Sequence, residues 1–422
     1  MTPEALNRNL AGHPAALALL SPLGHRTALP FGIPQQAAEA KFCERRATIG
    51  QITDGAGRPL ALPSLARHFI GMDPRESLLY APQHGLPRLR TRWADHVQRQ
   101  AGADIAISLP VVTAGITHAI SLCGELFTSP SQPIVIPLPY WDNYETIIGM
   151  RTGAPIRTFE AFDGPPSRGS PPRFNVAGLR AALAQLEGPA SLLLNFPANP
   201  TGYSPLADEV DGIVQAVADH PHPLAVICDD AYETLFFGEG LYGKSIFGAL
   251  ARAADPARHV ICKADGATKE LVFFGGRVGF LTFAVGGDAG EALAEKAAAL
   301  IRSTISSVPA PSQSAVLSAL ESPTLQNEQT AVLDVLRRRY WALKTSLDAS
   351  GLPYYPFNSG CFCLLPLPAG MDAEDTRKRL IAEQSVGVVR VASVNALRVA
   401  FCGIEAEDIP DLVERIARVV PA

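Results

Sequence analysis

The chain has 422 residues, of which 47% are hydrophobic and 18% are charged, and its formal net charge at pH 7 is −5. This length and composition predict two or three domains with a large core, and they exclude a disordered or coiled-coil protein. The negative charge balance and the lack of a basic run argue against nucleic acid as a partner. We expect no membrane partner, because the apolar stretch at residues 15–20 is too short to cross a bilayer.

The first part of the chain is polar and interrupted by prolines as far as residue 46. Residues 30–34 predict an extended segment around Phe31, and residues 35–46 predict a short helix. We expect this N-terminal arm to need a further surface on which to pack. Residues 47–52 predict a short strand, and residues 64–69 predict a short helix with a serine cap.

From residue 109 onward, short apolar runs alternate with helical patterns. The runs are continuous rather than alternating, which is typical of strands that are buried on both faces. The pattern predicts an α/β fold with a doubly wound, mostly parallel sheet, whose ligands bind beyond the carboxyl ends of the strands. The predicted strands cover residues 109–112, 133–138, 190–195, 223–228 and 259–262, and the helices cover residues 87–100, 114–127, 176–186 and 208–219.

The C-terminal part predicts a second, smaller α+β unit that N-terminal residues complete. We therefore divide the chain into an N-terminal arm with part of the small domain (1–85), a large domain (86–308) and a small C-terminal domain (309–422). Long helices are predicted at 288–303 and 312–347, strands at 360–367, 386–391 and 396–401, and helices at 372–384 and 407–419.

Seven cysteines are scattered along the chain, mostly in apolar segments. Cys361 and Cys363 would lie on the same face of a strand, and their spacing matches neither a zinc site nor a disulfide framework. We predict buried, reduced thiols, no metal site and a cytoplasmic location.

Chemically notable residues follow each of the five predicted strands. In chain order these residues are Gly115, Trp141, Asn199, Asp229 and Lys269. Because ligands of such sheets bind at the carboxyl ends of the strands, this coincidence of position predicts one shared site.

The segment 266–279 places Lys269 among small and apolar residues and Arg277 eight positions later, after a glycine pair. A lysine amine that is partly desolvated beside another cation loses proton affinity and can form a Schiff base. An arginine offers a planar set of donors suited to phosphate, and glycines allow the backbone to approach a ligand. The two residues together predict pyridoxal 5'-phosphate (PLP), which carries both an aldehyde and a phosphate.

Several short motifs occur in a fixed order between Tyr80 and Arg398. They are Tyr80…Gly85, Gly115-Ile116-Thr117, Pro139-Tyr140-Trp141, Asn199-Pro200-Thr201-Gly202, Asp229-Asp230-Ala231-Tyr232, Lys269…Arg277 and Arg398. Each motif is degenerate, but the ordered set resembles the class I/II aminotransferases of the fold-type I PLP enzymes.

The resemblance implies a catalytic role for Lys269, Asp229 and Tyr232, and a cofactor-binding role for Asn199. Lys269 would form the Schiff base and move a proton between the substrate and the cofactor. Asp229 would pair with the pyridine nitrogen, and Tyr232 and Asn199 would bond the ring's O3' oxygen. The residues alone leave other readings open, because Asp229 could cap a helix and residues 199–202 could form an ordinary turn.

The resemblance also assigns cofactor-binding residues outside that group. Gly115, Ile116 and Thr117 begin a helix after a strand, which suits a phosphate, as does Arg277. Trp141 would lie on the pyridine ring, and core packing is the alternative explanation for this residue. Tyr80 would reach the phosphate in the other subunit, which implies a homodimer with shared sites.

Arg398 matches the family's arginine for the substrate α-carboxylate, and Ile49 and Gly50 would line the substrate entrance. The chain departs from the usual family pattern at residues 47–51, and it has Gly266 where many members carry serine. These departures leave the amino acid and the 2-oxo acid unassigned. Ile49, Tyr140 and Arg302 are candidates for the side-chain pocket by position alone.

We weigh three functions. The first is an aminotransferase that moves an amino group between an α-amino acid and a 2-oxo acid. The second is a non-transaminating enzyme of the same fold, such as an eliminating lyase, a decarboxylase, a racemase or a condensing enzyme. The third is the sensory domain of a transcription regulator, which would carry a DNA-binding domain ahead of the fold. About 80 residues with little basic patterning precede Tyr80, which disfavours this third function.

Overall fold

The computed structural model describes residues 2–10, 18–28, 32–70, 72–102, 105–166 and 172–421. Phe31, around which we predicted an extended segment, lies outside these residues. Within the described ranges, no helix has the length and apolar content that crossing a membrane requires.

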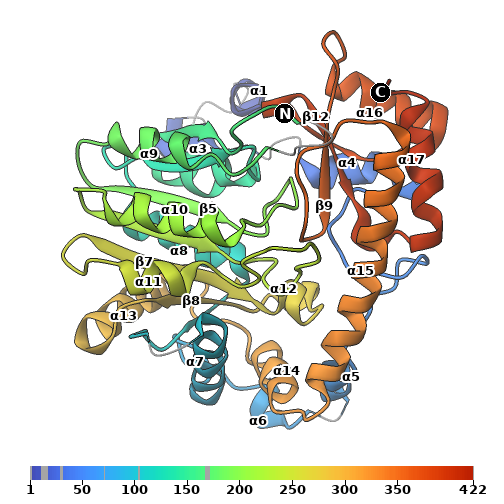
Figure 1. Cartoon of the computed structure of the whole chain (residues 1–422). Helices are drawn as coiled ribbons and strands as arrows, with labels where there is room; N and C mark the ends of the chain where they lie inside the picture. Colours follow the sequence, from blue (N-terminus) through green and yellow to red (C-terminus); the bar gives the residue numbers. More distant parts are fainter. Residues whose placement is uncertain are drawn as a thin grey trace.

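A seven-stranded sheet forms the centre of the large domain (Figure 1), with the strand order β2-β8-β7-β6-β5-β3-β4. Strand β8 is antiparallel to both of its neighbours, and the remaining pairs are parallel. The α/β fold with a mostly parallel sheet is therefore confirmed. The bounds are β2 Val111–Thr113, β3 Ile134–Leu138, β4 Ile156–Glu160, β5 Ala190–Asn195, β6 Leu224–Asp229, β7 His259–Gly266 and β8 Gly279–Phe283.

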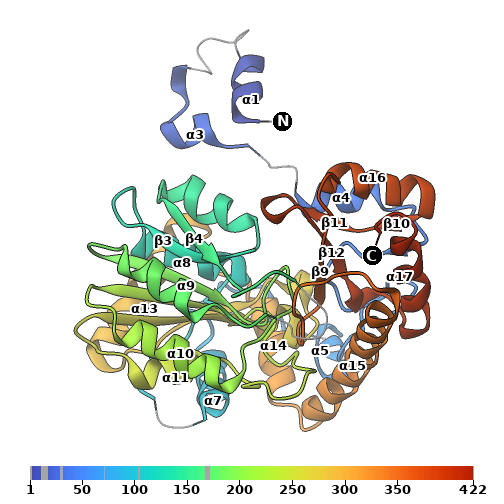
Figure 2. The same cartoon turned by 45° about the horizontal axis from the view of Figure 1, so that its top comes forward.

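Two layers of helices cover the sheet, and each layer closes its own apolar core. One face is covered by α8 (Ile116–Phe127) and α13 (Gly287–Thr304). The other face is covered by α7 (Pro87–Ala101), α9 (Val176–Ala184), α10 (Ala207–Ala218), α11 (Phe247–Ala253) and α14 (Ala310–Leu320) (Figure 2).

The small domain contains a three-stranded antiparallel sheet in the order β11-β12-β9. A second, two-stranded sheet pairs β1 with β10, so that residues near the N-terminus are built into this domain. The strands are β1 Arg45–Arg46, β9 Phe362–Pro366, β10 Val386–Gly387, β11 Val389–Val391 and β12 Ala396–Ala400, and the helices are α15 Leu325–Ser350, α16 Ala373–Gln384 and α17 Ile409–Ala417.

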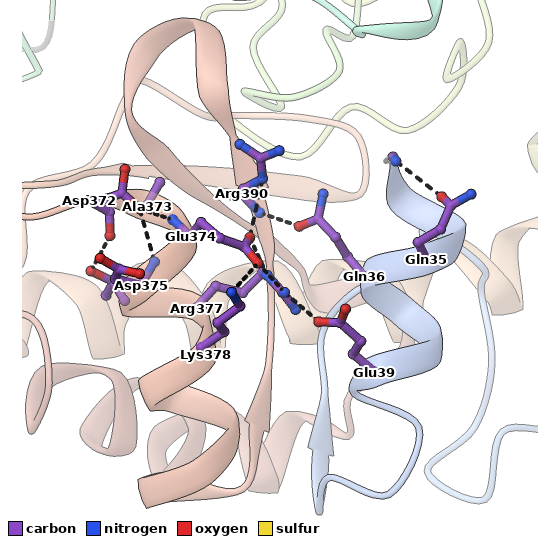
Figure 3. Close-up of polar contacts among 12 residues, drawn as sticks. Gln35, Gln36, Glu39, Asp372, Ala373, Glu374, Asp375, Arg377, Lys378 and Arg390 are labelled. Carbon is purple, nitrogen blue, oxygen red and sulfur yellow. Dashed lines mark hydrogen bonds and ion pairs between the residues drawn. The ribbon is translucent and has the colours of Figure 1, made fainter. Parts of the chain in front are cut away.

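Helix α4 (Ile33–Glu39) is fastened to the small domain by a polar network (Figure 3). Arg377 on α16 is buried, and its Nη2 contacts Glu39 Oε2 at 2.5 Å and Glu374 Oε1 at 2.7 Å. Gln36 Oε1 accepts a 2.8 Å hydrogen bond from the backbone N–H of Arg390. The network fixes α4 relative to the small domain.

Four short helices complete the N-terminal region: α1 (Pro3–Asn9), α3 (Pro22–Arg26), α5 (Pro63–Ala66) and α6 (Pro74–Ser77). Helices α1 and α3 are set apart from the two domains in Figure 2. Arg26 ties this unit to the large domain, because its Nε donates a 2.6 Å hydrogen bond to the carbonyl of Met150.

Several local predictions at the N-terminal end were wrong. The helix predicted at 35–46 starts at Ile33 and ends at Glu39, and its last residues form β1 instead. Residues 47–52 form no strand, although the N–H of Ala47 bonds the carbonyl of Gly387 at 2.8 Å. Tertiary pairing with the small domain therefore overrides the local pattern.

Two helix predictions also need correction. Ser64 does not cap α5, because Leu62 occupies the cap position and the Ser64 hydroxyl donates to Glu328 Oε2 at 2.7 Å. The single helix predicted at 312–347 is two helices, α14 and α15, which are separated by a turn at residues 321–324. That turn contains Pro323, which cannot continue a helix without losing a backbone hydrogen bond.

Candidate active site

A cavity of about 300 Å³ lies at the carboxyl ends of the sheet strands and also takes residues from the small domain. It gathers most of the predicted site residues into one place. Those that line it are Ile49, Gly50, Ile116, Thr117, Trp141, Asn199, Asp229, Tyr232, Lys269, Arg277 and Arg398. Gly115 lies behind Arg277, and Tyr80 is 94% exposed and outside the cavity of its own chain.

Lys269 lies in α12 (Ala267–Glu270), the single helical turn that follows β7. Burial lowers the pKa of its amine, the nearby Asp229 carboxylate opposes this shift, and Arg277 adds to it. The amine lies 4.7 Å from the centre of the Tyr232 ring. A larger fraction of this amine is therefore neutral at a given pH than for an exposed lysine, as a nucleophile requires.

Asp229 is the last residue of β6, and each of its carboxylate oxygens accepts one hydrogen bond. Its Oδ2 accepts a 2.5 Å hydrogen bond from the Tyr144 hydroxyl, and its Oδ1 accepts a 3.1 Å bond from the N–H of Ala231. Burial raises the pKa of Asp229 to about 6, although the Tyr144 bond lowers it. A turn rather than a helix follows Asp229, so the helix-cap reading is excluded.

Arg398 is buried in the middle strand of the small domain's sheet, where an uncompensated charge is costly. Its Nη1 donates to Asn199 Oδ1 at 2.9 Å, and its Nη2 donates to the Thr48 carbonyl at 2.8 Å. The guanidinium carbon lies 4.2 Å from the centre of the Phe362 ring. Among the described residues, Nε of Arg398 has no hydrogen-bond partner. The Arg398 guanidinium is thus held in place, and its Nε–H can donate a further hydrogen bond to a ligand.

Asn199 links Arg398 on the small domain to the end of β6 on the large domain. Its backbone N–H donates to Asn195 Oδ1 at 2.7 Å, and the Asn195 amide donates to the carbonyl of Asp229 at 2.8 Å. Asn199 therefore joins Arg398 on the small domain to the end of β6 on the large domain.

The far end of the cavity has the features of an anion site. Gly115 precedes α8 with a φ of 88°, and a Cβ there would lie 2.2 Å from Arg277 Nη2. Arg277 has a φ of 52°, and its Nη1 donates to the carbonyl of Phe274 at 3.1 Å. The first backbone N–H groups of α8, at Ile116 and Thr117, have no partners within the helix and suit a phosphate.

The structure explains why Gly266 replaces the commoner serine. A Cβ at this position would lie 2.6 Å from the Cα of Gly279 and 2.7 Å from the carbonyl oxygen of Val278, so no side chain fits. Thr268 lines the cavity, and its buried Oγ1 lacks a hydrogen-bond partner in the part of the chain that the structure describes. This hydroxyl is placed to provide the contact that Gly266 cannot make.

Ile49 and Gly50, which we predicted at a substrate entrance, line the cavity together with Ile33 from α4, which the sequence did not single out. A Cβ at Gly50 would lie 2.5 Å from Cζ of Phe362, so this position requires glycine. A second cavity of about 180 Å³ shares Trp141 and Arg398 with the first and is lined by Tyr140. Arg302 lines neither cavity, so its suggested role is not supported.

Sequence reasoning missed Tyr144 and Asn195, both of which line the cavity. Tyr144 lies three residues after Trp141, just before the π-helical turn Glu145–Met150. Asn195 ends β5 at the same level as Asp229 ends β6, because the two residues are register partners. The rule that ligands bind at strand ends would have found Asn195, whereas nothing in the sequence marked Tyr144.

A buried lysine whose pKa is lowered, a carboxylate at the end of a neighbouring strand and an anion cradle at a helix start define a PLP-binding site of fold type I. Residues 48–416 match the family model for aminotransferase class I and II, so the chain belongs to this family. Its cofactor is pyridoxal 5'-phosphate.

Individual relatives are distant. The chain is 25% identical over 269 residues to a probable aspartate/prephenate aminotransferase from Rickettsia felis, a match that covers 61% of each chain. It is 23% identical over 367 residues to 1-aminocyclopropane-1-carboxylate synthase 6 from Oryza sativa, which covers 80% of this chain and 63% of that protein. The crystal structure of an aminotransferase from Anaerococcus prevotii superposes with a TM-score of 0.82 at 23% identity, covering 94% of this chain and 98% of that one.

Proposed function

We propose that this protein is a PLP-dependent aminotransferase that moves an amino group between an α-amino acid and a 2-oxo acid. The observation that carries the proposal is the meeting of Lys269, Asp229 and Arg398 in one cavity, with an anion cradle at its far end. The bound cofactor supplies an aldehyde for covalent capture of an amine and a pyridine ring that accepts electrons from the substrate.

The large domain holds the cofactor. Gly115, Ile116, Thr117 and Arg277 would hold the phosphate, and the carboxylate of Asp229 would keep the ring nitrogen protonated. Tyr232 and Asn199 would bond the ring oxygen, and Trp141 would pack against the ring. Thr268 adds a hydroxyl to the phosphate end.

Lys269 has two roles in this proposal. It bonds the cofactor covalently through its neutral amine, which burial favours. The same amine, when free, would act as the base that accepts the proton from the substrate Cα and as the acid that returns it. Both roles need a lysine amine that is neutral at the pH at which the enzyme works. This shared requirement supports the assignment of both roles to Lys269.

Arg398 binds the α-carboxylate of the substrate with a bidentate pair of donors, while Asn199 and Thr48 hold the guanidinium in orientation. Ile33, Ile49 and Gly50 surround the path by which the substrate side chain enters.

The test of transamination is transfer of a labelled nitrogen. The purified holoenzyme is given an amino-acid panel labelled with ¹⁵N at the α-amino group, together with 2-oxo acids, and new amino acids are detected by mass spectrometry. The proposal predicts that the label appears in the amino acid made from the added 2-oxo acid. Label that appears as free ammonium, with no labelled amino acid formed, would contradict it.

The second candidate is a non-transaminating enzyme of the same fold. It is favoured by the similarity to the Oryza sativa synthase over 80% of the chain. The same labelling experiment separates the two candidates, because an eliminating or condensing enzyme leaves the nitrogen with the original substrate or releases it.

We also propose a homodimer with two shared sites, in the cytoplasm. Tyr80 is 94% exposed, and the neighbouring Leu78 and Leu79 are 80% and 64% exposed, which is an unusual concentration of apolar surface. A second copy would cover this segment and place Tyr80 at the partner's phosphate cradle. The seven free cysteines are all buried, which supports a reducing compartment.

A further inference from the structure

On the face of the sheet opposite the cavity, a cluster of charged side chains is buried under the ends of β6 and β7. Lys263 Nζ forms ion pairs with Asp230 Oδ2 and Glu233 Oε2, and it lies 3.7 Å from Asp265 Oδ2. All four side chains are at most 4% exposed. One lysine thus faces three carboxylates in the interior of the large domain.

Helix α7 and the segment before α11 surround this cluster with donors. Trp93 Nε1 donates to Asp265 Oδ1 at 3.0 Å, and the Ser245 hydroxyl donates to Asp230 Oδ2 at 2.6 Å. The Gln100 amide, oriented to donate, lies 3.1 Å from Glu233 Oε2. The cluster is therefore fixed by hydrogen bonds from several elements.

A second ion pair lies beside the first. His96 Nε2 on α7 lies 2.9 Å from Glu270 Oε1, and, with the Gln100 amide turned so that its nitrogen faces Glu233, the amide oxygen accepts from the same His96 nitrogen at 2.8 Å. The carboxylates of Glu270, Asp265 and Glu233 raise the pKa of His96 against the effect of burial. The buried thiol of Cys228, the register partner of Lys263, completes the titratable groups that face the cluster.

The cluster stands directly behind the two residues to which we assign the chemistry. Successive residues of a strand point to opposite faces, so Asp229 faces the cavity while Asp230 faces Lys263. On the short helix α12, Lys269 faces the cavity while Glu270 faces His96. The N–H of Asp230 also bonds the carbonyl of Ala264 on β7 at 2.9 Å. Each cavity residue therefore has its immediate neighbour anchored in the cluster.

Stability alone is a poor explanation for such a cluster. Buried ion pairs are often no more stabilising than apolar residues of similar volume, because desolvation offsets their attraction. They do fix geometry, since each bond is directional and has one favourable arrangement. The cluster also holds excess negative charge, and the neighbouring Asp230 is among the causes that raise the pKa of Asp229.

We propose that Lys263 is a positioning residue for the PLP site: through Asp230 and Asp265 it fixes the ends of β6 and β7, and so sets the separation of Asp229 and Lys269 and the electric field at the cofactor. This inference rests on the proposed roles of Asp229 and Lys269, and it holds whichever reaction the enzyme performs.

The test uses holoenzyme with Lys263→Met, which keeps the volume and removes the charge, and Lys263→Met/Asp230→Asn, which also removes a carboxylate that pairs with Lys263. Lys296→Met, an exposed lysine on α13, is the matched control. The readout is the pH titration of the visible absorption of the bound cofactor. Losing the positive charge of Lys263 raises the pH midpoint of this titration by about half a pH unit to one pH unit. The reason is that the protonated form of the bond between the cofactor and Lys269 is then favoured.

The double variant is expected to return the midpoint most of the way to the wild-type value while leaving the turnover low, because its geometry is not restored. For Lys263→Met, kcat falls roughly 10- to 100-fold with KM nearly unchanged. A folded Lys263→Met holoenzyme with the wild-type midpoint and kcat would overturn the inference.

Asp265→Asn tests the same idea if Lys263→Met does not fold. It removes a negative charge from the cluster with little change in shape, so the midpoint moves in the opposite direction, downward. An unchanged or raised midpoint in Asp265→Asn contradicts the inference. Failure of transamination is a separate result, because the titration needs only cofactor that is bound to Lys269.

Discussion

The Tyr144 hydroxyl donates a 2.5 Å hydrogen bond to Oδ2 of Asp229, deep in the cavity. Burial raises the pKa of Asp229 to about 6, and this bond lowers it, so Tyr144 favours the ionised carboxylate. Burial also raises the pKa of Tyr144 itself well above its usual value, so the phenol remains a donor. The pair keeps a negative charge in an apolar setting, where the cofactor's ring nitrogen is expected.

Replacing Tyr144 by phenylalanine should therefore destabilise the ionised form of Asp229 while leaving its carboxyl group in place. A hydrogen bond to a charged group is worth about 1.5–3 kcal/mol, which corresponds to roughly a 10- to 100-fold loss of kcat if the bond matters in the transition state. Steady-state kinetics should show this loss with PLP still bound. A Tyr144→Phe enzyme with full kcat would show that the bond is only structural.

Asp229→Asn should be more severe, because an amide cannot hold the ring nitrogen in its charged form. We expect PLP to remain bound, through the phosphate cradle and Lys269, while turnover is largely lost. The check combines a PLP titration with an activity assay. Near-normal activity of Asp229→Asn would mean that this carboxylate plays no part in the chemistry.

The lowered pKa of Lys269 gives a prediction about pH. Removing the Asp229 carboxylate removes an effect that raises this pKa, so Asp229→Asn lowers it further, whereas Arg277→Met raises it by removing a cation. The pH midpoint for capture of pyridoxal by the apoprotein, trapped with borohydride, should move down in the first variant and up in the second. Pyridoxal is used because it lacks the phosphate that Arg277 would bind.

The same trapped material identifies the lysine. Peptide mapping should place the label on Lys269, and Lys269→Ala should carry none. Lys263 is the informative comparison, because it is also buried but lies on the other face of the sheet. A label on Lys263 or Lys244 would contradict the assignment of the site.

Arg398→Ala should raise KM for every α-amino acid that is a substrate and leave PLP affinity unchanged. The loss of a bidentate charged pair is worth roughly 2–5 kcal/mol, which is more than a tenfold change in KM. Arg339→Ala is a useful contrast, because this arginine is also buried but contacts Glu405 and backbone carbonyls away from the cavity. Loss of PLP with unaltered KM in Arg398→Ala would contradict the role.

A shared site can be tested by mixing two inactive or impaired protomers, Tyr80→Ala and Lys269→Ala. A hybrid dimer then has one site with both lesions and one site with neither. Random mixing should restore about one quarter of the wild-type rate, because half of the dimers are hybrids with one intact site. Sedimentation that shows a fully active monomer at assay concentration would rule out the shared site.

The sequence was most informative where a buried strand ends in a polar residue. Asp229, Asn199 and Lys269 could be placed together because the carboxyl ends of parallel strands meet at one edge of the sheet. Strand β8 was missed because Gly279–Phe283 is short and follows the Arg277 loop without a turn signal. Its antiparallel pairing with β7 brings Gly279 against Gly266, a contact between residues 13 positions apart that local patterns do not encode.

Contacts between distant segments could not be predicted for the same reason. Tyr144 and Asp229 are 85 residues apart, and Arg398 meets Asn199 across 199 residues. The Lys263 cluster joins α7, β6, β7 and α12, and in the sequence Lys263 looked only like a charged residue near the end of a strand. Short N-terminal elements such as β1 were misassigned because pairing with the small domain, rather than propensity, decides their conformation.

The most direct measurement of the central claim is a half-reaction. Purified holoenzyme without a 2-oxo acid is mixed in turn with each member of a panel of amino acids, and its absorption spectrum is followed while the products are identified. The account predicts a stable shift to the spectrum of the pyridoxamine form, with one equivalent of 2-oxo acid released per site. Release of ammonia with full recovery of the starting spectrum would contradict it.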